Sequence, residues 1–163
     1  MSIPRGAACG AAAILLAAPC MARTAVPDDF NSCVLAEHWL TEDPRGDSTF
    51  EIVGEGSGDA VLAISVPGGQ HHDAWTEGNF TARVTQPFPN QDLDVHVVFD
   101  SPLAATYQSQ GLLVQQDHDD FLRIEFYSVN GTVRLFAASF NSGEPMVKLN
   151  TAVPVGPRMG LRV

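Results

Sequence analysis

Residues 107–140, YQSQGLLVQQDHDDFLRIEFYSVNGTVRLFAASF, decide the fold because they read as three consecutive strands joined by two tight turns. Apolar and polar side chains alternate through Phe121–Ser128, which is the period-2 pattern of a strand with one buried face. Asn130-Gly131 then separates two such runs, and this dipeptide readily takes positive φ at both central positions of a hairpin turn. The preceding turn, 117–120, is polar. The stretch therefore predicts an antiparallel meander at the centre of the protein.

Further strand-like runs lie on both sides of this meander, and turns bearing Gly or Pro separate most of them. The expected strands are Thr49–Val53, Ala60–Val66, Thr81–Gln86, Asp92–Asp100, Gly111–Gln116, Phe121–Ser128, Thr132–Phe140 and Pro145–Leu149. Many short strands at this spacing predict an all-β sandwich or barrel. The one expected helical turn is Cys33–Leu40, anchored by Val34, Trp39 and Leu40.

The alternation also predicts which side chains form the core between the sheets. The expected inward residues are Ala60, Leu62, Ile64, Val66, Leu93, Val95, Val97, Phe99, Leu112, Val114, Leu122, Ile124, Phe126, Phe136 and Phe140. The phase of Thr132–Phe140 stays open, because both faces of that strand carry apolar groups. Such a strand is either buried on both sides or carries a ligand platform.

The first 22 residues have the layout of a secretory signal peptide, with Arg5 in a short basic region, an apolar run at 7–18 and small residues up to Ala22. The run is too short to span a bilayer. We expect cleavage after Ala22, leaving one domain at 23–163 that is secreted to the periplasm or the extracellular space and is not inserted in a membrane. A buried N-terminal helix and lipid attachment at Cys20 are the weaker alternatives.

Charge and cysteine content narrow the partners. The chain has a formal net charge of −10, and losing the signal with its single basic residue leaves 8 basic against 19 acidic residues, a net charge of −11. Such an acidic chain repels phosphate backbones and anionic lipids, which excludes nucleic acid as an expected partner. Cys33 would be the lone cysteine, either reduced or paired outside this sequence. Residues 157–163 begin a strand that stops midway, so we expect a C-terminally truncated sandwich from a larger parent protein.

With this strand layout, the chain resembles the concanavalin A-like lectin/glucanase superfamily, and most of all the sandwich domains at the C-terminal end of bacterial β-xylosidases. The likeness runs from about residue 28 to the end. Its motifs are Asp28-Asp29-Phe30-Asn31, Leu35–Trp39, Asp43-Pro44-Arg45-Gly46-Asp47, His72-Asp73-Ala74-Trp75, Arg83 with Gln86, Phe99-Asp100-Ser101, Tyr107-Gln108, Gln110–Val114 and Asp119–Arg123. The resemblance implies a jelly-roll of two antiparallel sheets and a non-catalytic accessory role, commonly carbohydrate binding.

The spacing of carboxylates and histidines along the sequence gives little support for catalysis or for zinc binding. The glucanase branch of that superfamily places carboxylates as Glu-x-Asp-x-x-Glu on one strand, and neither Glu51 nor Glu125 has this spacing. Adjacent histidines at 71–72 would point to opposite faces of a strand and could not share one zinc ion. Calcium is the more plausible ion because oxygen ligands are plentiful, and a structural site would lie at Asp28 and Asp29. The alternative is that these acids only cap turns.

A carbohydrate site needs an aromatic face for a sugar ring and fixed polar groups for its hydroxyls. The expected ligand-binding residues are Trp75, Gln110, Gln115, Arg123, Glu125 and Tyr127. The odd-numbered row of 123–127 is expected on the solvated face opposite the core. For Arg123 and Glu125 the alternative is an ordinary surface ion pair, and for Trp75 a core or rim position.

The sequence thus predicts a non-catalytic carbohydrate-binding or adhesive module of a secreted bacterial protein. A second hypothesis is a structural spacer or protein-interaction domain that contacts other domains of a cell-surface protein. A third is an enzyme, a glycosidase or a lyase, with an unrecognised site.

Overall fold

The computed structural model describes residues 25–163, all of which lie in strands, turns and loops, with no helix among them. The predicted signal segment and its alternatives fall outside these residues. Within the described part of the chain, no helix has the length and hydropathy needed to cross a bilayer. The all-β prediction is confirmed, and the antiparallel pairing throughout is consistent with a β-sandwich.

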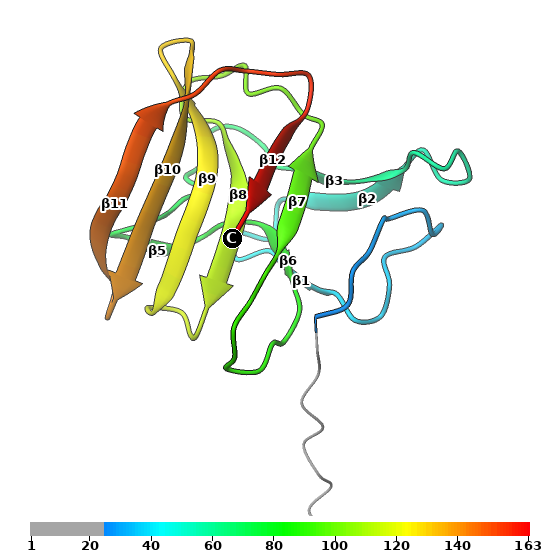
Figure 1. Ribbon diagram of the computed structural model, residues 1–163, viewed down its shortest axis with the longest axis horizontal. Coiled ribbons are helices and arrows are strands. Elements are labelled where there is room, and N and C mark those ends of the chain that lie inside the picture. The colour runs from blue at the N-terminus through cyan, green and yellow to red at the C-terminus, as the bar shows by residue number, and fades with distance from the viewer. Residues whose placement is uncertain (1–24) are drawn as a thin grey trace, which may run out of the picture.

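The predicted meander is the four-stranded sheet that organises the molecule (Figure 1). Its strands are β8 (Ser109–Gln115), β9 (Phe121–Val129), β10 (Thr132–Asn141) and β11 (Glu144–Ala152), in the order β11-β10-β9-β8. Asn130 and Gly131 have φ of 49° and 76°, so the β9–β10 turn is the expected type with positive φ at both central residues. Residues 142–143 do the same between β10 and β11.

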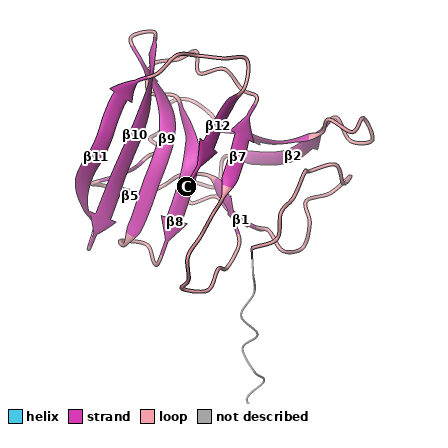
Figure 2. Ribbon diagram, in the orientation of Figure 1, coloured by secondary structure: helices cyan, strands magenta, loops and turns pink. Residues whose placement is uncertain are grey.

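Four two-stranded units surround this sheet, and Figure 2 shows the strands and their connecting loops. The pairs are β1 (Leu40–Glu42) with β6 (Arg83–Thr85), β2 (Thr49–Val53) with β3 (Val61–Ser65), β4 (Ala74–Trp75) with β5 (Gly78–Asn79), and β7 (His96–Phe99) with β12 (Met159–Arg162). The β2–β3 hairpin projects away from the four-stranded sheet (Figure 1). The predicted strand at 49–53 is confirmed to the residue. Of the strand expected at 92–100, only the second half forms a strand, β7.

Both faces of the four-stranded sheet are covered, which corrects the expectation of a single buried face. We call the side of the sheet that bears Ile124, Phe126 and Val133 the Phe126 face. Strands β7 and β12 pack on it, with Leu161 buried against Phe126 and Val133, and with Phe99 edge-on to Phe126 at 6.4 Å between ring centroids. Here the predicted inward residues Val97, Phe99, Leu112 and Ile124 contribute as expected.

The opposite side, which we call the Arg123 face, holds a second apolar cluster of Ala74, Phe121, Phe136, Ala138 and Phe140. The register pairs Phe136 with Glu125, and Phe140 with Phe121, so these two phenylalanines lie on the Arg123 face. Their burial was predicted correctly, but they belong to the layer opposite Leu112 and Phe126. The strand 132–141 is thus buried on both sides, one of the two open interpretations of its pattern.

Four predicted core residues are exposed instead. Leu122 and Val114 have 43% and 38% of their surface exposed, because β7 and β12 cover only the end of the Phe126 face nearest Val133. Ile64 and Val66 are 36% and 45% exposed, since the β2–β3 hairpin lies beside the main sheet.

The expected helical turn at 33–40 is also wrong. Of the three expected anchors, Val34 and Leu40 are 72% and 57% exposed, and only Trp39 is partly buried. The segment forms a single turn closed by Trp39 N–H donating to the Ala36 carbonyl at 3.0 Å. Asp28 organises it instead, since its carboxylate accepts the Trp39 indole N–H at 2.8 Å. Cys33 is exposed and in no disulfide within the described residues.

Candidate functional site

Trp75 is the residue around which the candidate site is built. The short β4–β5 hairpin lies on the Arg123 face, and its Ala74 is 1% exposed in the apolar cluster. The Trp75 ring packs against Phe136 at 6.0 Å and edge-on to Phe140 at 5.6 Å between centroids, yet 37% of the residue remains exposed. One side of the indole is therefore fixed by the core, and the other side is free to contact a ligand.

A buried guanidinium attaches this hairpin to the sheet. Arg123 on β9 is 8% exposed and donates to the Ala74 carbonyl at 2.5 Å, to the Asp73 carboxylate at 2.7 Å and to the Glu125 carboxylate at 2.6 Å. The Asp73 carboxylate also accepts the Ala74 N–H at 2.9 Å. Hydrogen bonds between ionised groups are stronger than neutral ones, so the backbone directly before Trp75 is held firmly.

Burial sets the protonation behaviour of this network. Glu125 is 7% exposed, and removal from water raises the pKa of its carboxyl above the usual 4.5, while the hydrogen bond and charge of Arg123 act in the opposite direction. Burial lowers the pKa of Arg123, but the hydrogen bonds and charges of Glu125 and Asp73 outweigh it, so its pKa is raised. Arg123 therefore stays charged, and it forms ion pairs with the carboxylates of Asp73 and Glu125.

Gly111 on β8 makes room for this arrangement. It pairs with Glu125 across the ladder, and a Cβ at this position would lie 2.3 Å from the Ile124 carbonyl oxygen and 2.4 Å from Glu125 Cβ. A glycine inside a strand often marks such a close approach. The absence of a side chain at 111 thus lets β8 approach β9 closely at Glu125.

A cavity of about 200 Å³ opens beside the indole at one end of the four-stranded sheet. Its lining residues are Trp75, Thr76, Glu77, Gly78, His118, Asp119, Phe121, Phe140 and Gly143. Three connections meet there: the β4–β5 turn, the β8–β9 turn and the β10–β11 turn. The aromatic floor is rigid, because Phe121 and Phe140 stack at 4.1 Å between centroids.

Hydrogen bonds fix the two sheet turns to each other. The Gly143 N–H donates to the Asp119 carbonyl at 3.0 Å, and the Ser142 N–H donates to the Asp120 carboxylate at 2.9 Å. Asp117 orders the first turn by accepting the N–H groups of residues 119 and 120 at 3.0 and 2.9 Å. The wall of the cavity is therefore organised before any ligand arrives.

Polar groups on this wall are free to bind a ligand. The side chains of Glu77, His118 and Asp119 are exposed, and none makes a hydrogen bond or ion pair with another residue in the range 25–163. They supply two carboxylate acceptors and an imidazole that both donates and accepts. Together with the indole, this is the combination of an apolar face and a few polar groups that small-molecule sites use.

The structure brings together part of the predicted ligand-binding set. Trp75 lies at the cavity, and Arg123 and Glu125 lie beneath its hairpin; the expectation that these two form a solvated surface row is wrong, because both are buried. Tyr127 is partly buried, edge-on to Phe136, with its hydroxyl donating to Asn150 at 3.1 Å.

The two predicted glutamines lie on opposite faces of β8. Gln115 pairs with Phe121 and is exposed at the cavity end of the sheet, although it does not line the cavity. Gln110 pairs with Phe126 and donates to the Ser101 carbonyl at 3.1 Å, so it belongs to the other face. An odd separation along a strand always places two side chains on opposite sides.

Sequence reasoning missed the turn residues of the wall, Thr76, Glu77, His118, Asp119 and Gly143. A signal existed, because successive turns of a meander alternate between its two ends. The first and third turns, at 117–120 and 142–143, therefore had to meet at one end. The arrival of Glu77 there depends on the β4–β5 hairpin, whose place on the sheet no local pattern reveals.

The expected calcium residues serve local structure. Asp28 accepts the Phe30 N–H at 2.8 Å besides the Trp39 indole, and Asp29 accepts the Asn31 N–H at 3.1 Å, a bond that is the largest cause of the lowered pKa of its carboxyl. The adjacent histidines do not share a site either, because the His72 Nε2 atom lies 2.7 Å from an Asp47 carboxylate oxygen. In the described range no group of three or more His, Cys, Asp or Glu side chains is arranged to hold a metal ion.

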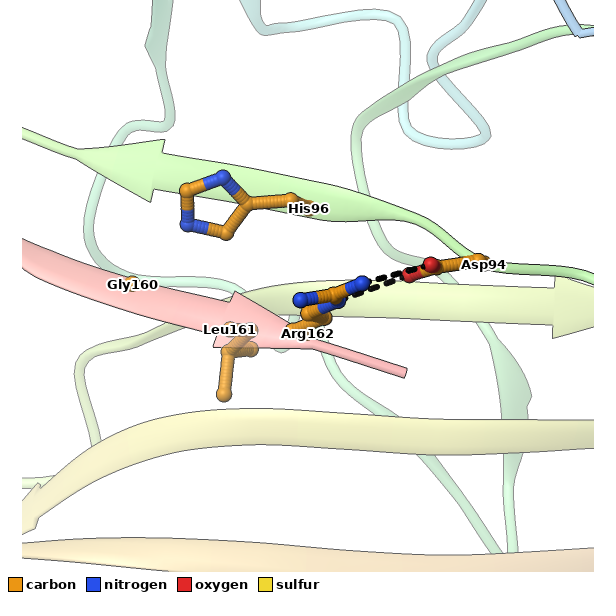
Figure 3. A pocket seen from close by; sticks show the side chains of 5 residues that line it. All are labelled: Asp94, His96, Gly160, Leu161 and Arg162. Carbon is orange, nitrogen blue, oxygen red and sulfur yellow. Dashed lines mark hydrogen bonds and ion pairs between the residues drawn. The ribbon is translucent and has the colours of Figure 1, made fainter.

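A larger hollow of about 470 Å³ lies elsewhere, on the outer side of the β7–β12 pair (Figure 3). It is lined by Asp94, His96, Gly160, Leu161 and Arg162. Arg162 donates to both carboxylate oxygens of Asp94, at 2.9 and 2.7 Å, so its main charged groups satisfy each other. The lining holds no Trp, Tyr or Phe, and we therefore place the candidate site at Trp75 despite the smaller volume there.

No protein-family model, curated protein or solved structure matches this chain.

Proposed function

We propose that this protein is a non-catalytic carbohydrate-binding or adhesive module of a secreted bacterial protein, with a concanavalin A-like jelly-roll as its fold. The single observation that carries the proposal is the position of Trp75. Its ring is fixed on one side by Phe136 and Phe140, is exposed on the other, and borders a cavity whose polar side chains have no partners in the described chain.

Sugar rings combine an apolar face of C–H groups with a rim of hydroxyls, and each part has a counterpart here. The indole offers a broad face for the C–H groups. Glu77, His118 and Asp119 offer acceptors and a donor for hydroxyls. Because both turns and the tryptophan are already held in place, little conformational entropy is lost when a ligand binds.

A binding role is favoured over hydrolysis by the state of the interior carboxyl. Glu125 has a raised pKa, as a general acid would, but it is 7% exposed and bonded to Arg123. A general acid must reach the glycosidic oxygen directly or through one water molecule. Glu125 does not line the cavity, so we assign it the role of supporting the Trp75 hairpin.

A glycan array, followed by affinity electrophoresis on the polysaccharides that score, tests the proposal. We expect retention of the wild type and its loss in Trp75→Ala. Tyr107→Ala is a matched control, since this aromatic residue is 77% exposed and lies outside the cavity lining. The proposal fails if the wild type is retained by no plant, algal or microbial polysaccharide.

A structural spacer or protein-interaction domain is the second candidate. The uncovered end of the Phe126 face favours it. Val114 and Leu122, 38% and 43% exposed, lie side by side on β8 and β9, and Met146 and Leu149, 60% and 40% exposed, lie on β11 beyond β10. Exposed apolar residues gathered on one face are typical of surfaces that contact another protein or domain. If Trp75→Ala lowers stability and no sugar is retained by the wild type, this candidate replaces the first.

A further inference from the structure

The charge of the cavity lining is one-sided. Glu77 from the β4–β5 turn and Asp119 from the β8–β9 turn both line it, and the nine lining residues include no Lys or Arg. Neither carboxylate is neutralised by an ion pair with another described residue, in contrast to Asp73, which faces Arg123 at 2.7 Å. The negative charge of both groups is therefore available to act on a ligand.

The buried guanidinium of the Arg123 face has its partners outside the cavity. Arg123 lies beneath the hairpin, where it binds Asp73, Ala74 and Glu125, and it does not line the cavity. The chain as a whole has a net charge of −10, which adds to the local field in the same direction. A carboxylate or sulfate entering the cavity would meet repulsion from two sides, with no Lys or Arg in the lining to offset it.

The size of the cavity limits what enters it. At about 200 Å³ it is smaller than the roughly 300–1,000 Å³ typical of sites for drug-sized ligands. It suits one sugar ring rather than a stretch of chain, with the ring lying between the exposed side of Trp75 and the turn wall at His118 and Asp119.

We propose that this cavity takes a single hexosamine ring with a free amino group, in preference to the neutral hexose of the same configuration, and that it rejects the corresponding uronic acid. This inference rests on the proposed carbohydrate-binding function. An ammonium group at hydrogen-bond distance would form charge-assisted bonds with Glu77 or Asp119. A hydroxyl at the same place makes only ordinary hydrogen bonds, and a ring carboxylate is repelled.

Matched polysaccharides isolate the charge of the ring from its shape. Cellulose oligosaccharides, chitosan oligosaccharides and oligoglucuronates share β-1,4-linked gluco rings and differ only at C2 or C6. A galacto set of α-1,4-linked oligosaccharides of galactose, galactosamine and galacturonic acid covers the other common configuration. In calorimetric titrations at low salt we expect, in at least one set, the order amino sugar, then neutral sugar, then uronate, with steps on the order of tenfold in affinity.

Variants test whether the two carboxylates cause this order. In Glu77→Gln/Asp119→Asn the ratio between amino sugar and uronate should fall towards one. The control Glu51→Gln/Asp92→Asn removes the same charge from exposed positions outside the cavity and should keep the order. High salt should reduce the differences in affinity between the three sugars for the wild type, because interactions between exposed charges are screened.

The outcomes separate the two proposals. Equal or tighter binding of uronates in the set that binds overturns the charge preference and leaves the carbohydrate function standing. The same holds if the double variant at the cavity keeps the wild-type order. If no oligosaccharide of either set binds and no other polysaccharide is retained, the carbohydrate function itself falls.

Discussion

Arg123 on β9 donates a 2.5 Å hydrogen bond to the carbonyl of Ala74, the residue directly before Trp75. The central sheet therefore holds the aromatic platform by its backbone as well as by the packing of the indole against Phe136 and Phe140. A contact of this kind is invisible in the sequence, where the two residues are 49 positions apart. It makes the buried ion network a positioning device for the candidate site.

Replacing Arg123 by methionine should destabilise the fold and weaken sugar retention together. The substitution leaves the carboxylate of Glu125 buried without its partner, which costs about 3–5 kcal/mol in comparable cases. Urea unfolding measures the loss. The control Arg158→Met removes an exposed guanidinium paired with Asp59 and Asp100, and its unfolding free energy should change little. Equal, small effects of both substitutions would contradict the account.

Glu125 and Asp94 should respond to pH with opposite signs. The pKa of Glu125 is raised by burial, so the folded chain binds its proton more tightly than the unfolded chain, and this contribution to stability is lost as pH rises above 4.5 through the folded pKa. The pKa of Asp94 is lowered by the hydrogen bond and charge of Arg162, so its contribution is present above 3.8 and is lost as pH falls below that value.

Denaturant unfolding across the acidic range checks these signs. Relative to the wild type, Glu125→Gln should gain stability as pH rises, because glutamine carries no charge to desolvate. Asp94→Asn should lose stability relative to the wild type as pH rises, since it lacks the ion pair. If the Glu125→Gln variant instead loses stability relative to the wild type as pH rises, the hydrogen bond from Arg123 has a larger effect on the pKa of Glu125 than burial has.

Adding a methyl group at Gly111 should disturb the Glu125 network. In Gly111→Ala the Cβ would clash with the Ile124 carbonyl oxygen, and overpacking of this kind costs about 1–3 kcal/mol. The control is Gly68→Ala, where nothing lies within 4 Å and φ is not positive. Thermal unfolding should show a clear drop in midpoint for the first variant alone; an unchanged midpoint would mean that the strands separate at no cost.

The cross-link between the two turns should matter more for binding than for folding. Asp120→Ala removes the acceptor of the Ser142 N–H, a bond worth about 0.5–1.5 kcal/mol. The turn wall loosens, so sugar affinity should fall. Asp120→Asn keeps an acceptor oxygen and should restore affinity in a titration. Equal affinity in both variants and the wild type would mean that the wall does not contact the ligand.

Local pattern was enough to predict the meander, because each hairpin is specified by its own turn residues and alternating strands. Asn130 and Gly131 show this directly, since their positive φ values are those the sequence predicts. The β2 strand at 49–53 was likewise predicted correctly.

Alternation does not reveal how many layers cover a sheet. Arg123 and Glu125 look like a solvated row by composition, yet they are buried because they neutralise each other beneath a hairpin that arrives from residues 74–79. Leu122 looks buried by the same rule and is exposed, because β7 and β12 cover only part of its face. The long-range placement of short strands decides the burial of all three residues. It also decides the position of Trp75, for which the sequence offers only the aromatic side chain.

Affinity electrophoresis of the wild type and Trp75→Ala, run side by side through the same sugar-containing gel, tests the central claim most directly. The account predicts that the wild type is retarded and that the variant, which loses the contacts with Phe136 and Phe140 but stays folded at the temperature of the gel, migrates as it does without sugar. Equal retardation of both proteins would place any sugar site elsewhere and contradict the account.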